Sequence, residues 1–506
     1  MCLPARGTAG LLVLLLAACS DLSRDPTTSA ELVGAATAAS YYVSPAGSPS
    51  GTGSWTFPWD LATALAGAGG VIHPGDTVWL RGGTYAGAFR TSLGGAAGNP
   101  IVFRRWRSER ATINGGLRVD GPDLVFWGLE IARSDTAVRD SLPGLEIYGP
   151  RTKVINLVIH DAVGQGIGFW DGAVDAEVYG CIVYNNGTHT NLDHGIYVHN
   201  PVTRGGSKLV MDNVFFQNLA YGIHAYARAT NPTQANVYLV GNVAFDNGTI
   251  STAYRANGNI IVGATTVDSA MHVIGNMLYF DRPAGVNLQL GYFQGVRNAD
   301  LEATGNYVEG GYWVFTMDNW TRATVRNNTF AENKSVWGTN LMVDLTDSAP
   351  AGGYTWGGNT YYRDTATIAW GYNGASYTFG GWKTATGLGA SDAATAPTPS
   401  NPVVFVRPNK YEPGRALVVV FNWPRQGSAS VDLSGVLQPG DTYEVRNVQA
   451  IFGAPVLIGT YDGTPILVPM SGVDRPAPIH VGSTVRVPLW DRTAPDFDAF
   501  IVTKRP

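Results

Sequence analysis

The sequence repeats one short motif, which reads Met211-Asp212-Asn213-Val214 and, one repeat later, Val240-Gly241-Asn242-Val243. In each copy an asparagine follows a residue that suits a tight turn, and apolar residues flank the pair. The other copies are Val154-Ile155-Asn156-Leu157, Ile274-Gly275-Asn276-Met277, Gly305-Asn306-Tyr307, Arg326-Asn327-Asn328-Thr329 and Gly358-Asn359-Thr360. From Asn213 on, successive asparagines lie about 22 to 34 residues apart, within the period range of stacked repeat proteins. The motif therefore predicts a stack of similar coils.

Each predicted coil is rich in short β-type segments and lacks helical periodicity. We expect three strands in a coil: one before the motif asparagine, one after it, and a third that begins Gly-Ile or Asn-Leu. An asparagine at the same corner of every coil can hydrogen-bond the coils above and below, so the backbone of a buried turn keeps its partners. The sequence thus predicts an all-β protein, a parallel β-helix.

The start of the predicted helix contains three further stretches with turn-rich, β-type patterns. They are Tyr41-Tyr42-Val43-Ser44-Pro45-Ala46-Gly47, Gly75-Asp76-Thr77-Val78-Trp79-Leu80-Arg81-Gly82-Gly83-Thr84-Tyr85 and Gly98-Asn99-Pro100-Ile101-Val102-Phe103. With the later coils, they resemble extracellular right-handed parallel β-helix proteins, the pectate-lyase-like superfamily, over residues 41–390. The resemblance implies a right-handed solenoid. It does not imply one reaction, because this fold hosts lyases, hydrolases, epimerases and binding proteins.

The coil pattern ends over Thr384–Asn401, which is rich in alanine, threonine, proline and serine. We therefore assign residues 41–390 to the β-helix, 391–401 to a linker and 402–506 to a second domain. Short strands between proline and glycine turns predict a small C-terminal antiparallel β-sandwich. We expect this domain to cap the last coil and shield its edge, with glycan binding as the alternative.

The amino-terminal residues 1–19 have the pattern of a bacterial lipoprotein signal peptide. Arg6 precedes an apolar core at Leu11–Leu16, and Leu16-Ala17-Ala18-Cys19 resembles a lipobox. We expect cleavage before Cys19, lipidation of its sulfur and a tether over residues 20–40, which predicts an outer-membrane or cell-surface lipoprotein facing the exterior or the periplasm. An ordinary secretory signal with a chance cysteine is the alternative. Of the remaining cysteines, Cys2 belongs to the same segment, and Cys181 occupies a motif position and is expected to be a small buried core residue.

The composition limits the possible partners. The chain has 506 residues, a formal net charge of −5 and 14% charged residues, which does not favour nucleic acid binding. We expect an extracellular polysaccharide as the partner, membrane contact only through the lipid on Cys19, and a monomer. No cofactor is expected, and a divalent cation such as calcium is left open.

The outward positions of the third strand series form two parallel columns on one face. One column runs Glu146, Gly168, Tyr197, His224, Ile261 and Gln289, and the other runs Tyr148, Trp170, His199, Tyr226, Gly263 and Gly291. Neighbouring strands lie about 4.8 Å apart, and alternate residues of one strand about 7 Å apart. The two histidines and the tyrosines beside them should therefore form a compact cluster, and the glycines should leave floor for a sugar ring.

Long loops enter and leave this face and are expected to wall a groove. Charged and polar residues in these loops are Asp193, His194, Arg204, Lys208, Arg228 and Arg255. We expect them to bind substrate or supply positive charge, together with Gln289 and the stacking faces of Tyr148 and Trp170.

The cluster supplies the parts that β-elimination on a uronic-acid polymer requires: a base, an acid and a cation for the carboxylate. His199 or His224 can serve as base, because imidazole titrates near neutrality. Tyr197 or Tyr226 can serve as acid or base, and Arg228, Arg204 or Lys208 can neutralise the carboxylate. The favoured hypothesis is a lyase that cleaves an acidic glycan.

Three alternatives remain at this point. A glycoside hydrolase would use two carboxyls from Glu146, Asp171 and Asp193. A metal site would use His189, Asp193 and His194, with His199 as a further ligand, although this spacing matches no specific zinc pattern. A non-catalytic glycan-binding or structural protein would carry exposed histidine and tyrosine only as good strand formers.

The motifs of individual enzyme families are absent from the sequence. Polygalacturonases carry an Asn-Thr-Asp, Asp-Asp, Gly-His-Gly and Arg-Ile-Lys set, and this chain has no such set. It also lacks the calcium-binding aspartate cluster and the catalytic arginine motif of the best-known pectate lyases. The resemblance therefore predicts the fold and leaves the reaction to the site residues.

Overall fold

The computed structural model describes residues 38–134, 142–188, 192–227, 233–252, 257–281, 285–292, 295–332, 340–347, 352–395, 398–480 and 493–505. The predicted signal peptide, Cys19 and nearly all of the predicted tether lie outside these residues. Within the described ranges, none of the helices combines the length and apolar character that crossing a bilayer requires.

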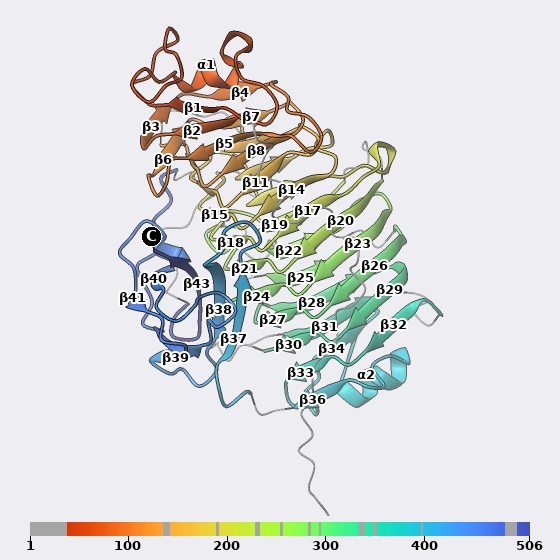
Figure 1. The fold of residues 1–506 in the computed structure, drawn as a ribbon. Coiled ribbons are helices and arrows are strands. Elements are labelled where there is room, and N and C mark those ends of the chain that lie inside the picture. The colour runs from red at the N-terminus through yellow and green to blue at the C-terminus, as the bar shows by residue number, and fades with distance from the viewer. Residues whose placement is uncertain are drawn as a thin grey trace, which may run out of the picture.

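Three parallel 12-stranded sheets run the length of the first domain, and we name them sheets A, B and C (Figure 1). Sheet A contains β1 (Ser40–Val43), β2 (Thr77–Leu80), β5 (Ile101–Arg105), β8 (Leu124–Trp127), β11 (Lys153–Ile155), β14 (Ala176–Tyr179), β17 (Lys208–Met211), β20 (Gln234–Val240), β23 (Asp268–Ile274), β26 (Asn298–Thr304), β29 (Trp320–Arg326) and β32 (Tyr354–Gly357). Sheet B contains β3 (Gly83–Ala86), β6 (Ala111–Asn114), β9 (Glu130–Ala132), β12 (Val158–His160), β15 (Ile182–Tyr184), β18 (Val214–Phe216), β21 (Val243–Phe245), β24 (Met277–Tyr279), β27 (Tyr307–Glu309), β30 (Thr329–Ala331), β33 (Thr360–Tyr362) and β36 (Ala393–Thr395).

Sheet C contains β4 (Phe89–Thr91), β7 (Leu117–Val119), β10 (Leu145–Ile147), β13 (Ile167–Phe169), β16 (Ile196–Val198), β19 (Ile223–Ala225), β22 (Gly258–Val262), β25 (Val286–Leu290), β28 (Trp313–Asp318), β31 (Leu341–Thr346), β34 (Trp370–Tyr372) and the antiparallel edge strand β35 (Ala375–Tyr377). From β2 to β34 the strands contribute to the sheets in the repeating order A, B, C, so each of these coils adds one strand to every sheet. The prediction of an all-β, right-handed parallel β-helix is confirmed.

The motif asparagines form a continuous ladder at the corner between sheets A and B. The side chain of Asn276 accepts hydrogen bonds from the backbone N–H of Asn242 at 3.0 Å and from its side-chain amide at 3.1 Å. Its own amide donates to the backbone carbonyl of Leu239 at 2.9 Å and to Asn306 Oδ1 at 3.0 Å. From Asn213 to Asn359 each motif asparagine is buried and hydrogen-bonded to its neighbours, as the repeat predicted.

Near the start of this ladder, Cys181 occupies a ladder position and Asn156 does not. Cys181 does occupy a ladder position: its N–H donates to Asn213 Oδ1 at 2.8 Å, and burial raises the pKa of its thiol to about 12. This is the small buried core residue that the sequence predicts. Asn156 does not occupy a ladder position. It has φ 55° and lies at the turn position that Asp212 and Gly241 fill in later coils, so Leu157 takes the ladder position instead.

A second asparagine ladder, which the sequence motif does not include, lies where sheet B turns toward sheet C. It consists of Asn186, Asn218, Asn247, Asn259 and Asn287, joined by side-chain hydrogen bonds of 2.8 to 2.9 Å. Between Asn247 and Asn259 the chain inserts a long loop, yet the ladder continues unbroken across it. The two ladders hold the backbone of successive coils in register at both ends of sheet B.

Short helices close the two ends of the solenoid. Helix α1 (Leu61–Leu65) packs on the first coils, and helix α2 (Phe379–Thr386) packs on the last coil, where Phe379 and Trp382 join the main core. The 3-10 helices are η2 (Ala68–Gly70), η3 (Val202–Arg204) and η6 (Val448–Ala450).

The second domain is a small antiparallel β-sandwich, as predicted. Its larger sheet contains β37 (Val403–Pro408), β38 (Arg415–Phe421), β43 (Phe497–Lys504), β40 (Thr442–Asn447) and β41 (Leu457–Thr460), and its smaller sheet contains β39 (Ser428–Val431) and β42 (Ile466–Pro469). Alternation along β38 directs Val418 and Val420 into the core between the two sheets. Strand β36 still pairs with β33, so parallel coils extend to Thr395.

The sandwich does not cap the last coil, and that expectation is wrong. Its larger sheet packs side-on against sheet B, beside β12 to β27 (Figure 1). Leu417, Val419 and Phe421 of β38 contact an apolar stripe on the outer face of sheet B that includes Phe216 and Phe245. Because sheet B carries outward apolar residues in successive coils, it needs a second layer, whereas α2 already covers the last coil.

Candidate functional site

The two predicted columns lie on the outer face of sheet C in the predicted register. Glu146 pairs with Gly168, Gly168 with Tyr197, Tyr197 with His224, His224 with Ile261, and Ile261 with Gln289. The second column follows at the strand ends, where the N–H of His199 donates to the Phe169 carbonyl and that of Tyr226 to the Val198 carbonyl. Strand alternation therefore suffices to place the histidines and tyrosines together.

Aromatic and imidazole rings form an unbroken stripe along this face. The ring centroids are 6.0 Å apart for Tyr148 and Trp170, 5.5 Å for Trp170 and Tyr197, and 5.5 Å for Tyr197 and His224. The stripe continues with His224 and Tyr226 at 4.8 Å. Tyr197 is buried, whereas the rings of Tyr148, Trp170, His224 and Tyr226 are partly exposed and offer faces on which sugar rings can stack.

A shallow cavity of about 620 Å³ opens beside the end of this stripe that contains Tyr148 and Trp170. Its lining residues are Tyr148, Trp170, Asp171, His199, Pro201, Thr203 and Arg204. Arg204 and Asp171 form an exposed ion pair, with 3.3 Å between Nη2 and Oδ2. Of the predicted site residues, the structure thus brings His199, Trp170, Tyr148, Arg204 and Asp171 together around one opening.

His194 and Asp193 hold the loop before β16. His194 is buried, and its Nδ1 accepts a hydrogen bond from the N–H of Tyr221 at 3.3 Å. Burial, with a contribution from His224, lowers the pKa of His194 well below its usual range, so its imidazole is neutral at physiological pH. Asp193 is also buried, and its Oδ2 accepts the N–H of Thr188 at 2.9 Å. Both side chains position neighbouring groups and offer little surface to a polymer.

Lys208 lies inside the solenoid and not in the wall of a groove, contrary to the expectation for this residue. It is the first residue of β17, and its fully buried ammonium donates to the backbone carbonyls of Phe169, at 2.9 Å, and Trp170. Burial lowers the pKa of Lys208 well below its usual range. Its ammonium fixes the end of β13, directly before the Trp170 side chain that lines the cavity.

The glycines at the lower end of the second column do not leave an open floor, and that expectation is wrong. A Cβ on Gly263 would lie 2.7 Å from Tyr292 Cβ, and one on Gly291 would lie 2.5 Å from the Asp318 carbonyl oxygen. The chain after β25 therefore covers this part of the face, and Ile261 is fully buried beneath it. Gln289 is half-buried below this segment, apart from the cavity lining.

Several predicted residues lie outside the described ranges, namely Arg228, Arg255 and His189. Within the described ranges, no cluster of three or more histidine, cysteine, aspartate or glutamate side chains could hold a metal ion. The three predicted hydrolase carboxyls are not gathered around the cavity: Asp171 lines it, Asp193 is buried in its loop, and Glu146 accepts the Tyr148 hydroxyl at 3.4 Å.

Sequence reasoning missed three charged groups of the same face. The guanidinium of Arg118 lies 4.1 Å from the ring centre of Tyr148, so the stripe ends on a cation. Asp318 and Asp344 lie farther along the same sheet, on the adjacent strands β28 and β31, beyond the coils that carry Gly263 and Gly291. Burial raises the pKa of Asp318 to about 6 and also raises that of Asp344. The register extends each column by simple alternation, which would have revealed Arg118 and Asp344.

Comparison with known proteins agrees with this architecture. Residues 41–286 match the model of the family described as Pel9A-like, right handed beta helix region. No curated protein matches the chain.

Three solved structures are similar to this chain. Pectate lyase Pel9A is 18% identical over 65% of this chain and 80% of its own, with a TM-score of 0.42. A GH136 lacto-N-biosidase from Eubacterium ramulus is 13% identical over 70% of this chain and 67% of its own, with a TM-score of 0.42. An alginate lyase from Paenibacillus sp. str. FPU-7 is 18% identical over 71% of this chain and 98% of its own, with a TM-score of 0.37. Residues 41–286 thus match a Pel9A-like right-handed β-helix region, in agreement with the right-handed parallel β-helix that the resemblance to the pectate-lyase-like superfamily implied.

Proposed function

We propose that the protein binds an acidic, uronate-containing polysaccharide along the outer face of sheet C and cleaves it by β-elimination. The observation that carries this proposal is the continuous stripe of rings beside a cavity lined by His199, Arg204 and Asp171. The stripe supplies stacking surfaces for sugars, and the cavity gathers a titratable imidazole, a cation and a carboxylate within one opening.

His199 is the proposed base because it lines the cavity. In the reaction it takes the proton beside the uronate carboxylate, the electron pair forms a carbon–carbon double bond, and the bond to the glycosidic oxygen breaks. The hydroxyl of Tyr226, on the adjacent coil, gives that oxygen a proton. His224 is the alternative base, but it is stacked against Tyr221 at 5.3 Å and Tyr226 at 4.8 Å.

Arg204 is the proposed partner of the substrate carboxylate. Its side chain is exposed, and its only ion pair within the described part of the chain is the exposed one with Asp171. An exposed pair of this kind contributes little free energy, so a uronate carboxylate can replace Asp171 at small cost. Neutralising the carboxylate makes the neighbouring proton more acidic, which is what elimination requires.

A hydrolase at the cavity receives less support. Hydrolysis needs two carboxyls on opposite sides of the bond, about 5 to 9.5 Å apart. Asp171 is the only carboxyl in the lining of the cavity, and Asp193 is engaged by the backbone of its own loop. The available groups therefore favour elimination.

We also propose that the mature protein acts at the bacterial cell envelope, held by a lipid on Cys19 and the tether over residues 20–40. The lipobox-like Leu16-Ala17-Ala18-Cys19 supports this location. Labelling with a radioactive fatty acid should mark the wild-type protein and not Cys19→Ala. An unlabelled wild-type protein would mean an ordinary secretory signal.

The catalytic assignment can be tested with two variants and a matched control. His199→Ala and Tyr226→Phe should each lower kcat on the cleaved polymer by about a hundredfold or more, since each removes a proton-transfer group. The control is His272→Ala, because His272 forms a similar stack with Tyr238, 4.2 Å away, on sheet A, and pairs there with Glu302. Full activity of both site variants, in protein that unfolds at the wild-type temperature, would refute the assignment.

A further inference from the structure

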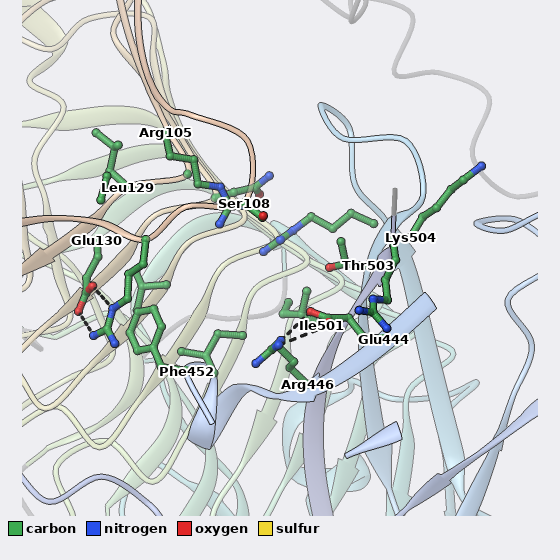
Figure 2. A pocket seen from close by; sticks show the side chains of 18 residues that line it. Arg105, Ser108, Leu129, Glu130, Glu444, Arg446, Phe452, Ile501, Thr503 and Lys504 are labelled. Atoms are coloured by element: carbon green, nitrogen blue, oxygen red, sulfur yellow. Dashed lines mark hydrogen bonds and ion pairs between the residues drawn. The ribbon is translucent and has the colours of Figure 1, made fainter. Parts of the chain in front are cut away.

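A second cavity, of about 510 Å³, lies between the β-helix and the sandwich (Figure 2). On one side it is lined by residues of sheets A and B and of the corner between them, including Arg105 and Glu130. On the other side it is lined by strands β40 and β43 of the sandwich, including Arg446 and Thr503. No residue of sheet C contributes to its lining, so it is separate from the proposed cleavage site.

The lining of this cavity is strongly basic, although the protein as a whole carries a net charge of −5. Its cations are Arg105, Arg110, Arg415, Arg446, Lys504 and Arg505, whereas its acidic residues are Glu130 and Glu444. Such an excess of positive charge around a concave surface raises the local concentration of anions.

The acidic residues of the lining are already engaged. Glu130 accepts two hydrogen bonds from Arg110, at 2.5 and 2.6 Å, and one contact of 2.9 Å from His160. Although burial opposes it, hydrogen bonding to Asp161 and Glu130 raises the pKa of His160 to about 9. The Asp161 carboxylate, 2.6 Å away, offsets the charge of His160. Glu444 pairs with Arg446 at 2.7 Å. Two further cations of the lining pair with carboxylates outside it, Lys504 with Asp441 at 2.6 Å and Arg415 with Glu412 at 3.6 Å. Arg105 and Arg505 are thus the lining cations that form no ion pair within the described ranges.

Arg105 has no ion pair or side-chain hydrogen bond with any other residue in the described ranges. It extends across Gly128, where a Cβ would lie 3.0 Å from its Nε, and Figure 2 shows it directed toward the cavity. Burial lowers the pKa of Arg105, although Glu412 opposes this effect. Its guanidinium is only partly buried and forms no side-chain hydrogen bond within the described ranges, so its N–H groups are available to an anion in the cavity.

The cavity also offers apolar surface beside its cations. Phe452 lies under the guanidinium of Arg110, 3.7 Å from its ring centre, and Ile501 and Val158 contribute aliphatic surface. A guanidinium beside an aromatic ring matches an acidic sugar, which has a charged substituent on a largely apolar ring face.

We propose that this cavity binds an acidic sugar unit of the polysaccharide through its carboxylate or sulfate, with Arg105 as the principal contact. The choice of a sugar rests on the proposed function, whereas the preference for an anion rests on the cavity alone. Since the site uses both domains, it gives the sandwich a role in holding the polymer while sheet C cleaves another part of it.

Calorimetric binding to the full mature protein tests this inference. The probes are a short oligouronate, a neutral oligosaccharide of the same length and inorganic sulfate, each titrated into His199→Ala protein to prevent turnover. Adding Arg105→Gln should weaken oligouronate binding by about tenfold or more, because a charge-assisted contact is lost. Arg105→Lys should weaken it less, and Arg322→Gln, at an exposed arginine of sheet A paired with Asp300, should leave it unchanged.

Unchanged oligouronate affinity in Arg105→Gln protein that is folded would overturn the inference. Equal affinity for sulfate and oligouronate would keep the anion site and overturn its assignment to a sugar. The outcomes for the two proposals differ: turnover with no Arg105-dependent binding refutes this site only, and Arg105-dependent binding with no turnover refutes only the lyase.

Discussion

Asn276 shows how single residues hold the solenoid. Its side chain makes four hydrogen bonds inside the corner, and Asn276→Ala would leave several backbone and side-chain groups without partners. We expect the substitution to lower the free energy of unfolding by about 3 kcal/mol, measured by urea denaturation. The control is Asn327→Gly, at an exposed turn position with φ 56°, which glycine adopts readily. A similar loss in both variants would contradict the structural role of the ladder.

The buried carboxyl of Asp268 should make the stability of the protein depend on pH. It is fully buried at the start of β23, and burial raises the pKa of its carboxyl to about 8, although the amide of Gln234 opposes this. Between about pH 4 and pH 8 the folded protein therefore holds a proton that the unfolded chain releases, so this residue makes stability fall as pH rises. Asp268→Asn should remove this part of the slope and stabilise the protein most at pH 8. Parallel stability curves for the two proteins would contradict the assignment.

For single residues, the sequence predicted the hydrogen-bonded asparagine ladder but not the burial of Lys208. The spacing of the motif identified the buried ladder from Asn213 to Asn359, because each of these residues occupies the same corner of its coil. It could not show that Lys208 turns inward, since a lysine at the edge of a loop is usually exposed. The backbone carbonyls that bind its ammonium come from a strand about forty residues earlier in the chain, beyond the reach of local pattern.

Among the elements, the turns between sheets A and B allow a matched test of how the two domains meet. Gly241 and Gly275 have φ 65° and 61°, so alanine at either position costs about 1 to 2 kcal/mol in backbone strain. At Gly241 a Cβ would also lie 2.2 Å from Arg407 Nη2, displacing the partner of Asp212, whereas nothing lies within 4 Å at Gly275. Gly241→Ala should therefore lower the unfolding midpoint further than Gly275→Ala. Equal losses would mean that the Arg407 contact does not contribute to stability.

Among the structural elements, the strands of sheet C were predicted best, because their residues alternate between the two faces of the sheet. This alternation gave the register of six strands and placed His199, His224 and the tyrosines on one face. What it missed was the segment after β25, where Tyr292 covers Gly263, because a loop that folds back over a sheet leaves no periodic signal. The opening consequently lies at Tyr148 and Trp170, the residues predicted to stack, and not above the glycines.

In the whole molecule, two domains share one long interface that the sequence did not predict. Each was recognisable alone, but their contact depends on which outward positions of sheet B are apolar, and short strands such as Val214–Phe216 are buried on both faces. Arg475 and Asp246 form a buried ion pair of 2.7 Å across it. This packing creates the basic cavity and leaves the outer face of sheet C, on another side of the solenoid, uncovered by the sandwich.

The measurement that tests the central claim most directly is turnover of a polymer panel by the mature protein. Pectate, alginate, a glycosaminoglycan and neutral glycans would be incubated with it while near-ultraviolet absorbance and reducing ends are recorded together. Elimination leaves an unsaturated uronate, so we predict that both signals rise in step on at least one acidic polymer and on no neutral one. Reducing ends without absorbance would contradict the account in favour of hydrolysis, and silence in both channels would contradict a catalytic role for the sheet C face.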